Sequence, residues 1–76
     1  MNKHKHEFVI CINNRGYEVS LEPRKLYEIL ADAEAEKHNQ IRVIDESGED
    51  FLYPASLFDR ITLPAQVIEH VFYAQA

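Results

Sequence analysis

Two apolar patterns mark the N-terminal part of the chain as β structure. Residues 7–12 contain a continuous apolar run rich in β-branched side chains, which predicts a buried strand. Segment 13–16, Asn-Asn-Arg-Gly, predicts a hairpin turn because Asn and Gly tolerate positive φ. Segment 17–21 then alternates apolar and polar side chains, and this period of two predicts a half-buried strand. The apolar face of that strand is Tyr17, Val19 and Leu21.

Residues 23–38 are compatible with two interpretations. Several of their apolar side chains fall at helical spacing, so one long helix could cover the segment. Its charges oppose that helix, because basic residues would lie at the positive N-terminal end and acidic ones in the negative half. In the second interpretation, residues 25–31 form a strand and Asp32 caps a short helical turn over 33–37, which Asn39 ends in a left-handed conformation. Propensity alone leaves both open.

The second half of the chain contains a clearer hairpin. Residues 41–45 predict a strand, 46–49 a turn with Gly48 in the left-handed position, and 51–53 a returning strand. Pro54 ends this strand because proline has no amide N–H for the ladder.

Three short elements complete the chain. Residues 55–58 suit one turn of 3₁₀ helix, and 61–63 suit a short strand. Pro64 then opens a helix with one apolar face, which we expect to pack on the sheet or, alternatively, to join two copies of the chain. That face consists of Val67, Ile68, Val71 and Phe72.

The segment from Gly48 to Ile61 resembles the end of a Src homology 3 domain, in which a strand runs into a proline, one 3₁₀ turn follows and a short strand closes the barrel. The resemblance favours a strand over 25–31. It implies a mainly β fold, a small Src-homology-3-like barrel of five or six strands with a C-terminal helix. The alternative is an α+β fold with one helix at 23–38 over a four-stranded sheet.

The match to that family is incomplete, and a second resemblance adds no activity. Peptide-binding members stack a proline-rich ligand on a tryptophan and several tyrosines. This chain has no tryptophan, and Leu57 stands where a ligand-facing tyrosine is usual, so that Pro54 alone carries over from the groove. The segment from Ile41 to Pro54 also resembles a family of short, uncharacterised bacterial proteins.

The composition fits one globular domain. Of the 76 residues, 46% are hydrophobic, which is too many for a disordered chain. The length suffices for one domain over 1–76, with 1–5 as a frayed terminus. The single cysteine, Cys11, cannot form an internal disulfide, which suits a reducing cytoplasm, and the N-terminus lacks the apolar region of a signal peptide.

The net charge of −5 is unevenly distributed. Residues 1–30 hold five basic and four acidic side chains, a sum of +1, whereas 31–76 hold three basic and nine acidic ones, a sum of −6. Nucleic-acid binding depends largely on Lys and Arg that neutralise phosphates, so this pattern argues against it. No apolar stretch approaches the roughly 20 residues of a membrane-spanning helix. We therefore expect another protein as the partner, and neither nucleic acid nor a membrane.

The residues with catalytic or metal-binding chemistry do not form a complete site. His4 and His6 fall at i, i+2, but zinc needs at least three protein ligands. Cys11 lies between β-branched neighbours, which is typical of a core residue rather than a nucleophile. Two isolated glycines cannot build a phosphate loop. The sequence therefore predicts no catalytic residue, metal or cofactor.

Four carboxylates flank the Ser-Gly turn of the second hairpin, namely Asp45, Glu46, Glu49 and Asp50. They lack the spacing of a calcium loop, and a hairpin tip is usually solvated, which argues against acid–base catalysis. We interpret them as a solvated acidic turn that docks a basic partner, with Tyr53 and Pro54 supplying apolar contact. The sequence thus predicts a non-enzymatic protein-interaction module, monomeric in preference to dimeric. The alternative is a small enzyme or a metal-dependent regulatory protein.

Overall fold

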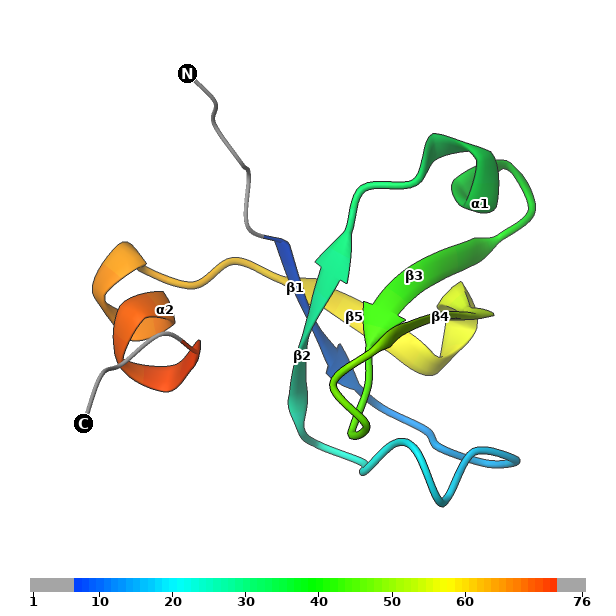
Figure 1. Cartoon of the computed structure of the whole chain (residues 1–76), viewed down its shortest axis with the longest axis horizontal. Coiled ribbons are helices and arrows are strands. Elements are labelled where there is room, and N and C mark those ends of the chain that lie inside the picture. The colour runs from blue at the N-terminus through cyan, green and yellow to red at the C-terminus, as the bar shows by residue number, and fades with distance from the viewer. Residues whose placement is uncertain (1–6, 73–76) are drawn as a thin grey trace.

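The fold is mainly β, as expected. A computed structural model describes residues 7–72, with side chains up to His70 (Figure 1). Five strands form one antiparallel sheet in the order β4-β3-β2-β1-β5, which leaves β4 and β5 as its two edges. The elements in chain order are β1 Glu7–Cys11, β2 Leu26–Leu30, α1 Ala33–Lys37, β3 Gln40–Ile44, β4 Asp50–Pro54, the 3₁₀ turn η1 Ala55–Leu57, β5 Phe58–Ile61 and α2 Ala65–Phe72.

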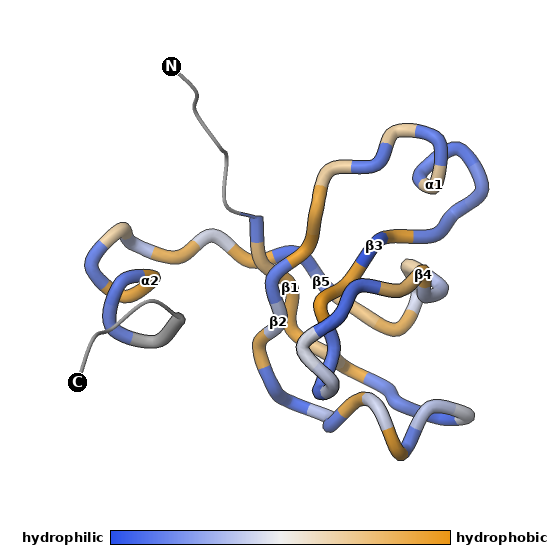
Figure 2. Tube along the Cα trace, in the orientation of Figure 1, coloured by the Kyte–Doolittle hydropathy of each residue, from blue (hydrophilic) through white to orange (hydrophobic). Residues whose placement is uncertain are grey.

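The core lies on one face of this sheet. The register places Val9 opposite Tyr27, and Ile41 opposite Tyr53, so that alternate residues of neighbouring strands share a face. The ring of Phe58 packs edge-on against both tyrosines. Hydrophobic positions concentrate in the strands, whereas the connecting segments are more hydrophilic (Figure 2). The buried cluster comprises Val9, Cys11, Leu21, Tyr27, Ile29, Ile41, Val43, Tyr53, Leu57 and Phe58.

The segment 23–38 divides into a strand and a short helix, so the interpretation as one helix is wrong. β2 occupies its middle, with alternate side chains buried, and α1 begins after Asp32. Oδ1 of Asp32 accepts a hydrogen bond from the backbone N–H of Ala35 at 3.0 Å, which caps the helix as predicted. Asn39 follows α1 with φ of 60°, the left-handed conformation expected of it.

The strand predicted over 17–21 is absent, and consecutive turns replace it. The carbonyl of Tyr17 accepts hydrogen bonds from the N–H groups of Ser20 and Leu21, at 3.1 and 2.9 Å. The chain therefore curls, and its apolar residues separate. Leu21 enters the core with 0% exposure, whereas Val19 is 99% exposed.

The C-terminal elements differ from the prediction by a few residues. β5 begins immediately after η1, so the strand expected at 61–63 is displaced towards the N-terminus. α2 begins at Ala65, directly after Pro64, and lies at the opposite end of the molecule from α1 (Figure 1). Val67 and Ile68 are half-buried. The side chains of Val71 and Phe72 lie outside the described ones, so the packing of that apolar face, and a dimer through it, stay predictions.

Candidate binding surface at the β3–β4 hairpin

The turn between β3 and β4 has the geometry that its sequence predicts. The N–H of Asp45 donates to the carbonyl of Glu49 at 3.0 Å, and the N–H of Gly48 donates to the carbonyl of Asp45 at 2.9 Å. Gly48 has φ of 86°, a conformation in which a side chain would be strained. This turn closes the hairpin that holds all four predicted carboxylates.

Asp45 does not lie on the surface of the hairpin, so the prediction of a solvated carboxylate is wrong here. It is 7% exposed, and its Oδ2 accepts a hydrogen bond from the hydroxyl of Tyr53 at 2.6 Å. Its Oδ1 accepts from both the hydroxyl and the N–H of Ser47, at 2.6 and 2.9 Å. Burial raises the pKa of Asp45, but the hydrogen bonds from Ser47 and Tyr53 outweigh it and lower that pKa below its ordinary value. Asp45 therefore stabilises the turn as a buried carboxylate.

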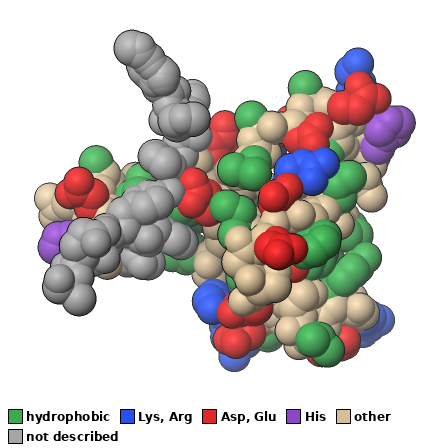
Figure 3. All heavy atoms as spheres, viewed as in Figure 1, with side chains coloured by type: hydrophobic (Ala, Val, Ile, Leu, Met, Phe, Trp, Pro, Cys, Tyr) green, Lys and Arg blue, Asp and Glu red, His purple; other side chains and the backbone are tan. Residues whose placement is uncertain are grey.

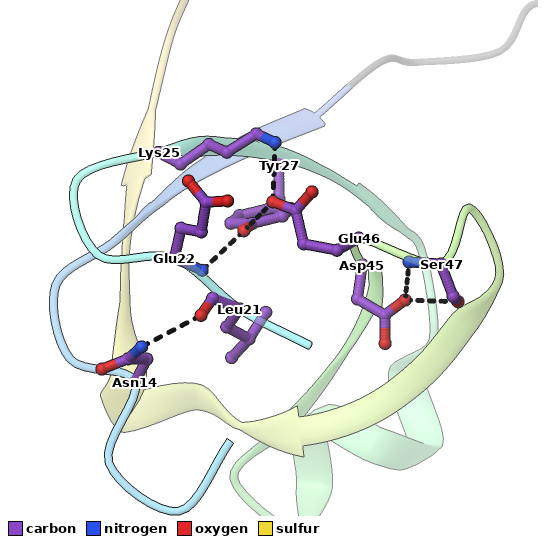
Figure 4. A network of polar contacts seen from close by, with 8 residues as sticks. All are labelled: Asn14, Leu21, Glu22, Lys25, Tyr27, Asp45, Glu46 and Ser47. Atoms are coloured by element: carbon purple, nitrogen blue, oxygen red, sulfur yellow. Dashed lines mark hydrogen bonds and ion pairs between the residues drawn. The ribbon is translucent and has the colours of Figure 1, made fainter. Parts of the chain in front are cut away.

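Glu46 connects the hairpin to the segment that precedes β2 (Figure 4). Its Oε2 accepts a hydrogen bond from the hydroxyl of Tyr27 at 2.6 Å and pairs with Nζ of Lys25 at 2.6 Å. The same hydroxyl accepts from the N–H of Glu22 at 2.8 Å. The contacts with Lys25 and Tyr27 lower the pKa of Glu46, and burial together with the bond to Glu46 raises the pKa of Tyr27. Glu46, like Asp45, is thus held by other side chains of the protein.

A shallow groove of about 230 Å³ opens beside this network. The ladder between β2 and β3 joins Ile29 to Val43 and Leu30 to Arg42, so the two strands diverge towards the hairpin. Asp45 and Glu46, which line the groove, are already bonded to other side chains of the protein. The remaining residues that line it are Lys25, Leu26, Tyr27, Glu28, Ile44 and Gly48.

Glu49 and Asp50 are exposed carboxylates at the β4 side of the turn. One Oδ of Asp50 pairs with Nη1 of Arg42 at 3.0 Å, and Nε of Arg42 pairs with Asp32 at 2.9 Å. One guanidinium is therefore shared between two carboxylates. Within residues 7–70, the exposed side chain of Glu49 forms no ion pair. Among the described residues, no cation therefore pairs with the negative charge of Glu49.

The apolar contact residues of the hairpin also differ from the expected ones. Tyr53 is only 4% exposed and belongs to the core, and Pro54 is half-buried. The exposed apolar side chains are those of Phe51 and Leu52, at 49% and 41%. The exposure of this pair was not predicted, although consecutive apolar residues in a strand must point to opposite faces. At the edge strand β4, neither side chain is fully covered.

The described residues form no candidate metal site. Residues 7–70 contain no group of three or more His, Cys, Asp or Glu side chains that could hold a metal ion. His4 and His6 lie outside the described residues. Cys11 is a free thiol buried in the core, and burial raises its pKa. None of the helices in the described part of the chain is long and apolar enough to span a membrane.

Comparison with known proteins does not assign the chain to a family. No family model matches the chain. No curated protein and no solved structure matches it either.

We expect the free energy of unfolding to decrease as the pH falls below about 4.5. Folding lowers the pKa values of Asp45 and Glu46 from their ordinary 3.8 and 4.5. The folded protein then binds fewer protons than the unfolded chain, so their stabilisation is complete above the unfolded-state pKa and is lost as the pH falls through the folded-state pKa. Urea midpoints measured in steps from pH 7 to pH 3 test this. In the Asp45→Asn variant, the midpoint should decrease less steeply as the pH falls. If the midpoint of that variant depends on pH as steeply as that of the wild type, the acid sensitivity belongs to other carboxylates.

Proposed function

We propose that this protein is a non-enzymatic interaction module that binds a basic protein partner at the β3–β4 hairpin. The binding surface, which we call the acidic edge, consists of Glu49, Asp50, Phe51 and Leu52. One observation carries the proposal. Two exposed carboxylates are followed by two exposed, large apolar side chains where the turn enters β4, and among the described residues this strand has a neighbour on one side only. Acidic and hydrophobic side chains lie next to one another on the face seen in Figure 3.

The charge of the acidic edge favours a basic partner. Glu49 has no ion pair within residues 7–70, and Asp50 shares Arg42 with Asp32. Residues 31–76, which contain the acidic edge, carry all of the excess negative charge, with a sum of −6 against +1 for residues 1–30. Clustered exposed charge of one sign accelerates association with the opposite sign and disfavours partners of the same sign. The exposed side chains of Phe51 and Leu52 add the apolar area that interfaces need at their centre.

The internal use of Asp45 and Glu46 supports a binding role rather than acid–base chemistry. Asp45 accepts three hydrogen bonds from Ser47 and Tyr53, and Oε2 of Glu46 contacts both Lys25 and Tyr27. Both pKa values are lowered, so both groups are ionised at neutral pH. A general acid or base works best with a pKa near the operating pH. The pKa values of Asp45 and Glu46 are shifted away from neutral pH instead.

We also infer that the sheet is the scaffold of a small Src-homology-3-like barrel in a cytoplasmic protein. Support comes from the antiparallel order β4-β3-β2-β1-β5 and from η1 between the two edge strands. The carbonyl of Leu57 in η1 accepts hydrogen bonds from the N–H groups of Ile12 and Asn13, which ties this turn to the end of β1. The standard proline-rich ligand of that family is not proposed, because Leu57 is buried and tryptophan is absent.

The proposed function predicts that Glu49→Lys weakens partner binding several-fold at low salt. The control is Glu69→Lys, which makes the same charge change at an exposed position on α2. Both proteins are immobilised, and basic proteins retained from a lysate of the source cells are quantified at about 50 and 500 mM salt. The screening length shrinks from roughly 14 to 4 Å over this range, so salt should release the partners.

Wild-type protein and Glu69→Lys should retain the same basic proteins at low salt, and Glu49→Lys should lose them. If all three retain the same set, the hairpin is a solvated turn without a binding role. Equal losses in Glu49→Lys and Glu69→Lys would mean that net charge, and not the acidic edge, governs the capture.

A further inference from the structure

We propose that the partner binds as an extended strand along the free edge of β4, extending the sheet by one strand. This inference rests on the proposed function and specifies how the acidic edge is used. The occupant is a segment of a basic protein in which adjacent β-forming apolar residues are followed by Lys or Arg. The acidic edge selects it through backbone hydrogen bonds, two apolar contacts and charge.

The hydrogen-bond pattern of the hairpin identifies the backbone groups on the free edge. The N–H of Asp45 bonds to Glu49, and the N–H of Ala55 bonds to Asn39. These pairs bracket the β3–β4 ladder, in which Arg42 lies opposite Leu52. Hydrogen-bonded pairs alternate along an antiparallel ladder, so the odd-numbered residues of β4 direct N–H and C=O towards β3.

The even-numbered residues of β4 therefore direct their backbone groups away from the sheet. Asp50 and Leu52 each present one N–H and one C=O on this side. Among the described residues, no other strand pairs with this edge, because β4 is the last strand in the sheet order. Pro54 ends the available stretch because it has no N–H. A strand of this kind is a template for an added chain.

The side chains of the acidic edge specify what the added strand would contain. Leu52 lies on the outer face beside Arg42, and Phe51 lies on the core face beside Val43. Both are half-exposed, so an added strand with apolar residues on both faces would cover them. Asp50 and the adjacent Glu49 then face the next residues of the partner. Opposite charges on neighbouring strands are favourable, which places Lys or Arg there.

A basic segment fits this edge better than a second copy of the chain. Each copy carries a net charge of −5, and pairing β4 with itself would bring two acidic edges together. Pro54 would also lie within the paired stretch of both copies and remove one donor from each. A segment that supplies its own N–H groups and positive charge has neither disadvantage.

The test uses a labelled synthetic peptide of alternating valine and isoleucine flanked at both ends by lysine pairs. A matched peptide carries glutamates in place of the lysines. We expect the lysine peptide to bind the full chain at 50 mM salt and the glutamate peptide to bind at least about ten-fold more weakly. Amide hydrogen exchange of the complex should slow about ten-fold or more at Asp50 and Leu52. Exchange at Phe51 and Tyr53, whose N–H groups already bond to β3, should change little.

Two variants isolate the backbone contribution. Leu52→Pro removes the outward N–H without touching the bonds of Phe51 or Tyr53, and Leu52→Ala controls for the lost side chain. Leu52→Pro should bind the peptide about ten-fold more weakly than Leu52→Ala does. Two further peptides give the same test on unchanged protein. One is N-methylated at every odd-numbered residue and the other at every even-numbered residue, so that only one of them loses the N–H groups that face β4. One of them should lose binding about ten-fold, and the other should keep it.

The outcomes separate this inference from the proposed function. If the lysine peptide binds but exchange at Asp50 and Leu52 is unaffected, or both methylated peptides bind equally well, strand addition is wrong and the acidic edge binds in another manner. If no binding tighter than about 1 mM is found while basic proteins are still captured through Glu49, strand addition is likewise wrong. Concentration-dependent dimers that protect the same amides would make a second copy the occupant and overturn the basic segment.

Discussion

Replacing Leu21 by alanine is expected to lower the free energy of unfolding by about 2–5 kcal/mol. Leu21 lies in a loop, yet it is 0% exposed and belongs to the core cluster that the strands form. Its carbonyl accepts a hydrogen bond from Nδ2 of Asn14 at 3.0 Å, which fixes the loop over the core. Alanine would leave a cavity that this constrained loop cannot close. Among the described core residues that are less than 2% exposed, Leu21 is the largest, ahead of Val9 and Val43 from the strands.

The matched control is Val19→Ala, two residues away. Val19 is 99% exposed, so its truncation should change the free energy of unfolding by less than about 0.5 kcal/mol. Urea unfolding of both variants measures the difference from the midpoint at unchanged slope. Leu21→Met conserves volume and should cost less than about 1.5 kcal/mol, which keeps the comparison measurable if the alanine variant is largely unfolded. If both alanine variants lose the same large amount of unfolding free energy, the side chains of Val19 and Leu21 are both buried, as the predicted strand requires.

This pair of residues shows where periodicity misleads. A period of two places Val19 and Leu21 on the same face of a strand, and the sequence offers no local signal against it. The observed turns depend instead on Tyr17 accepting two hydrogen bonds and on Arg24 adopting φ of 67°. The N–H of Arg24 bonds to the carbonyl of Cys11, a contact between distant segments. Such tertiary constraints are not encoded in a short sequence window.

Elements fixed by local chemistry were predictable. Asp32 caps α1 through its own side chain, and Gly48 and Asn39 adopt the left-handed conformation that their residue types tolerate. The division of residues 23–38 was open from propensity, and the strand in its middle depends on pairing with β1 and β3. Local signals therefore located turns and caps, whereas strand boundaries required the sheet.

The hairpin of the candidate site could be located along the chain, but the burial of its side chains could not. The sequence predicts a hairpin with clustered carboxylates, and the structure contains that hairpin. Asp45 and Tyr53 do not face each other in the ladder, since Tyr53 pairs with Ile41. Register therefore does not bring them together, and their hydrogen bond could not be anticipated. For the same reason, the pattern could not show which carboxylates remain exposed.

Replacing Asp45 by alanine is expected to lower the free energy of unfolding by about 3 kcal/mol. The change removes the acceptor of three hydrogen bonds and leaves the hydroxyl of Tyr53 buried without this partner. Bonds to a charged acceptor contribute about 1.5–3 kcal/mol, and an unsatisfied buried donor adds a further cost. Asp45→Asn keeps the shape and one acceptor, so it should cost less. Urea unfolding at pH 7 measures both variants.

A double-mutant cycle assigns this cost to the contact between the two side chains. Tyr53→Phe alone should lower the free energy of unfolding by about 1–2 kcal/mol, because it removes one donor and leaves Asp45 with both bonds from Ser47. Once the hydroxyl is gone, Asp45→Ala no longer leaves it unsatisfied, so the double variant should be more stable than the sum of the single losses by about 1 kcal/mol. Additive losses would mean that Asp45 stabilises the turn through Ser47 alone and that the 2.6 Å contact with Tyr53 contributes little.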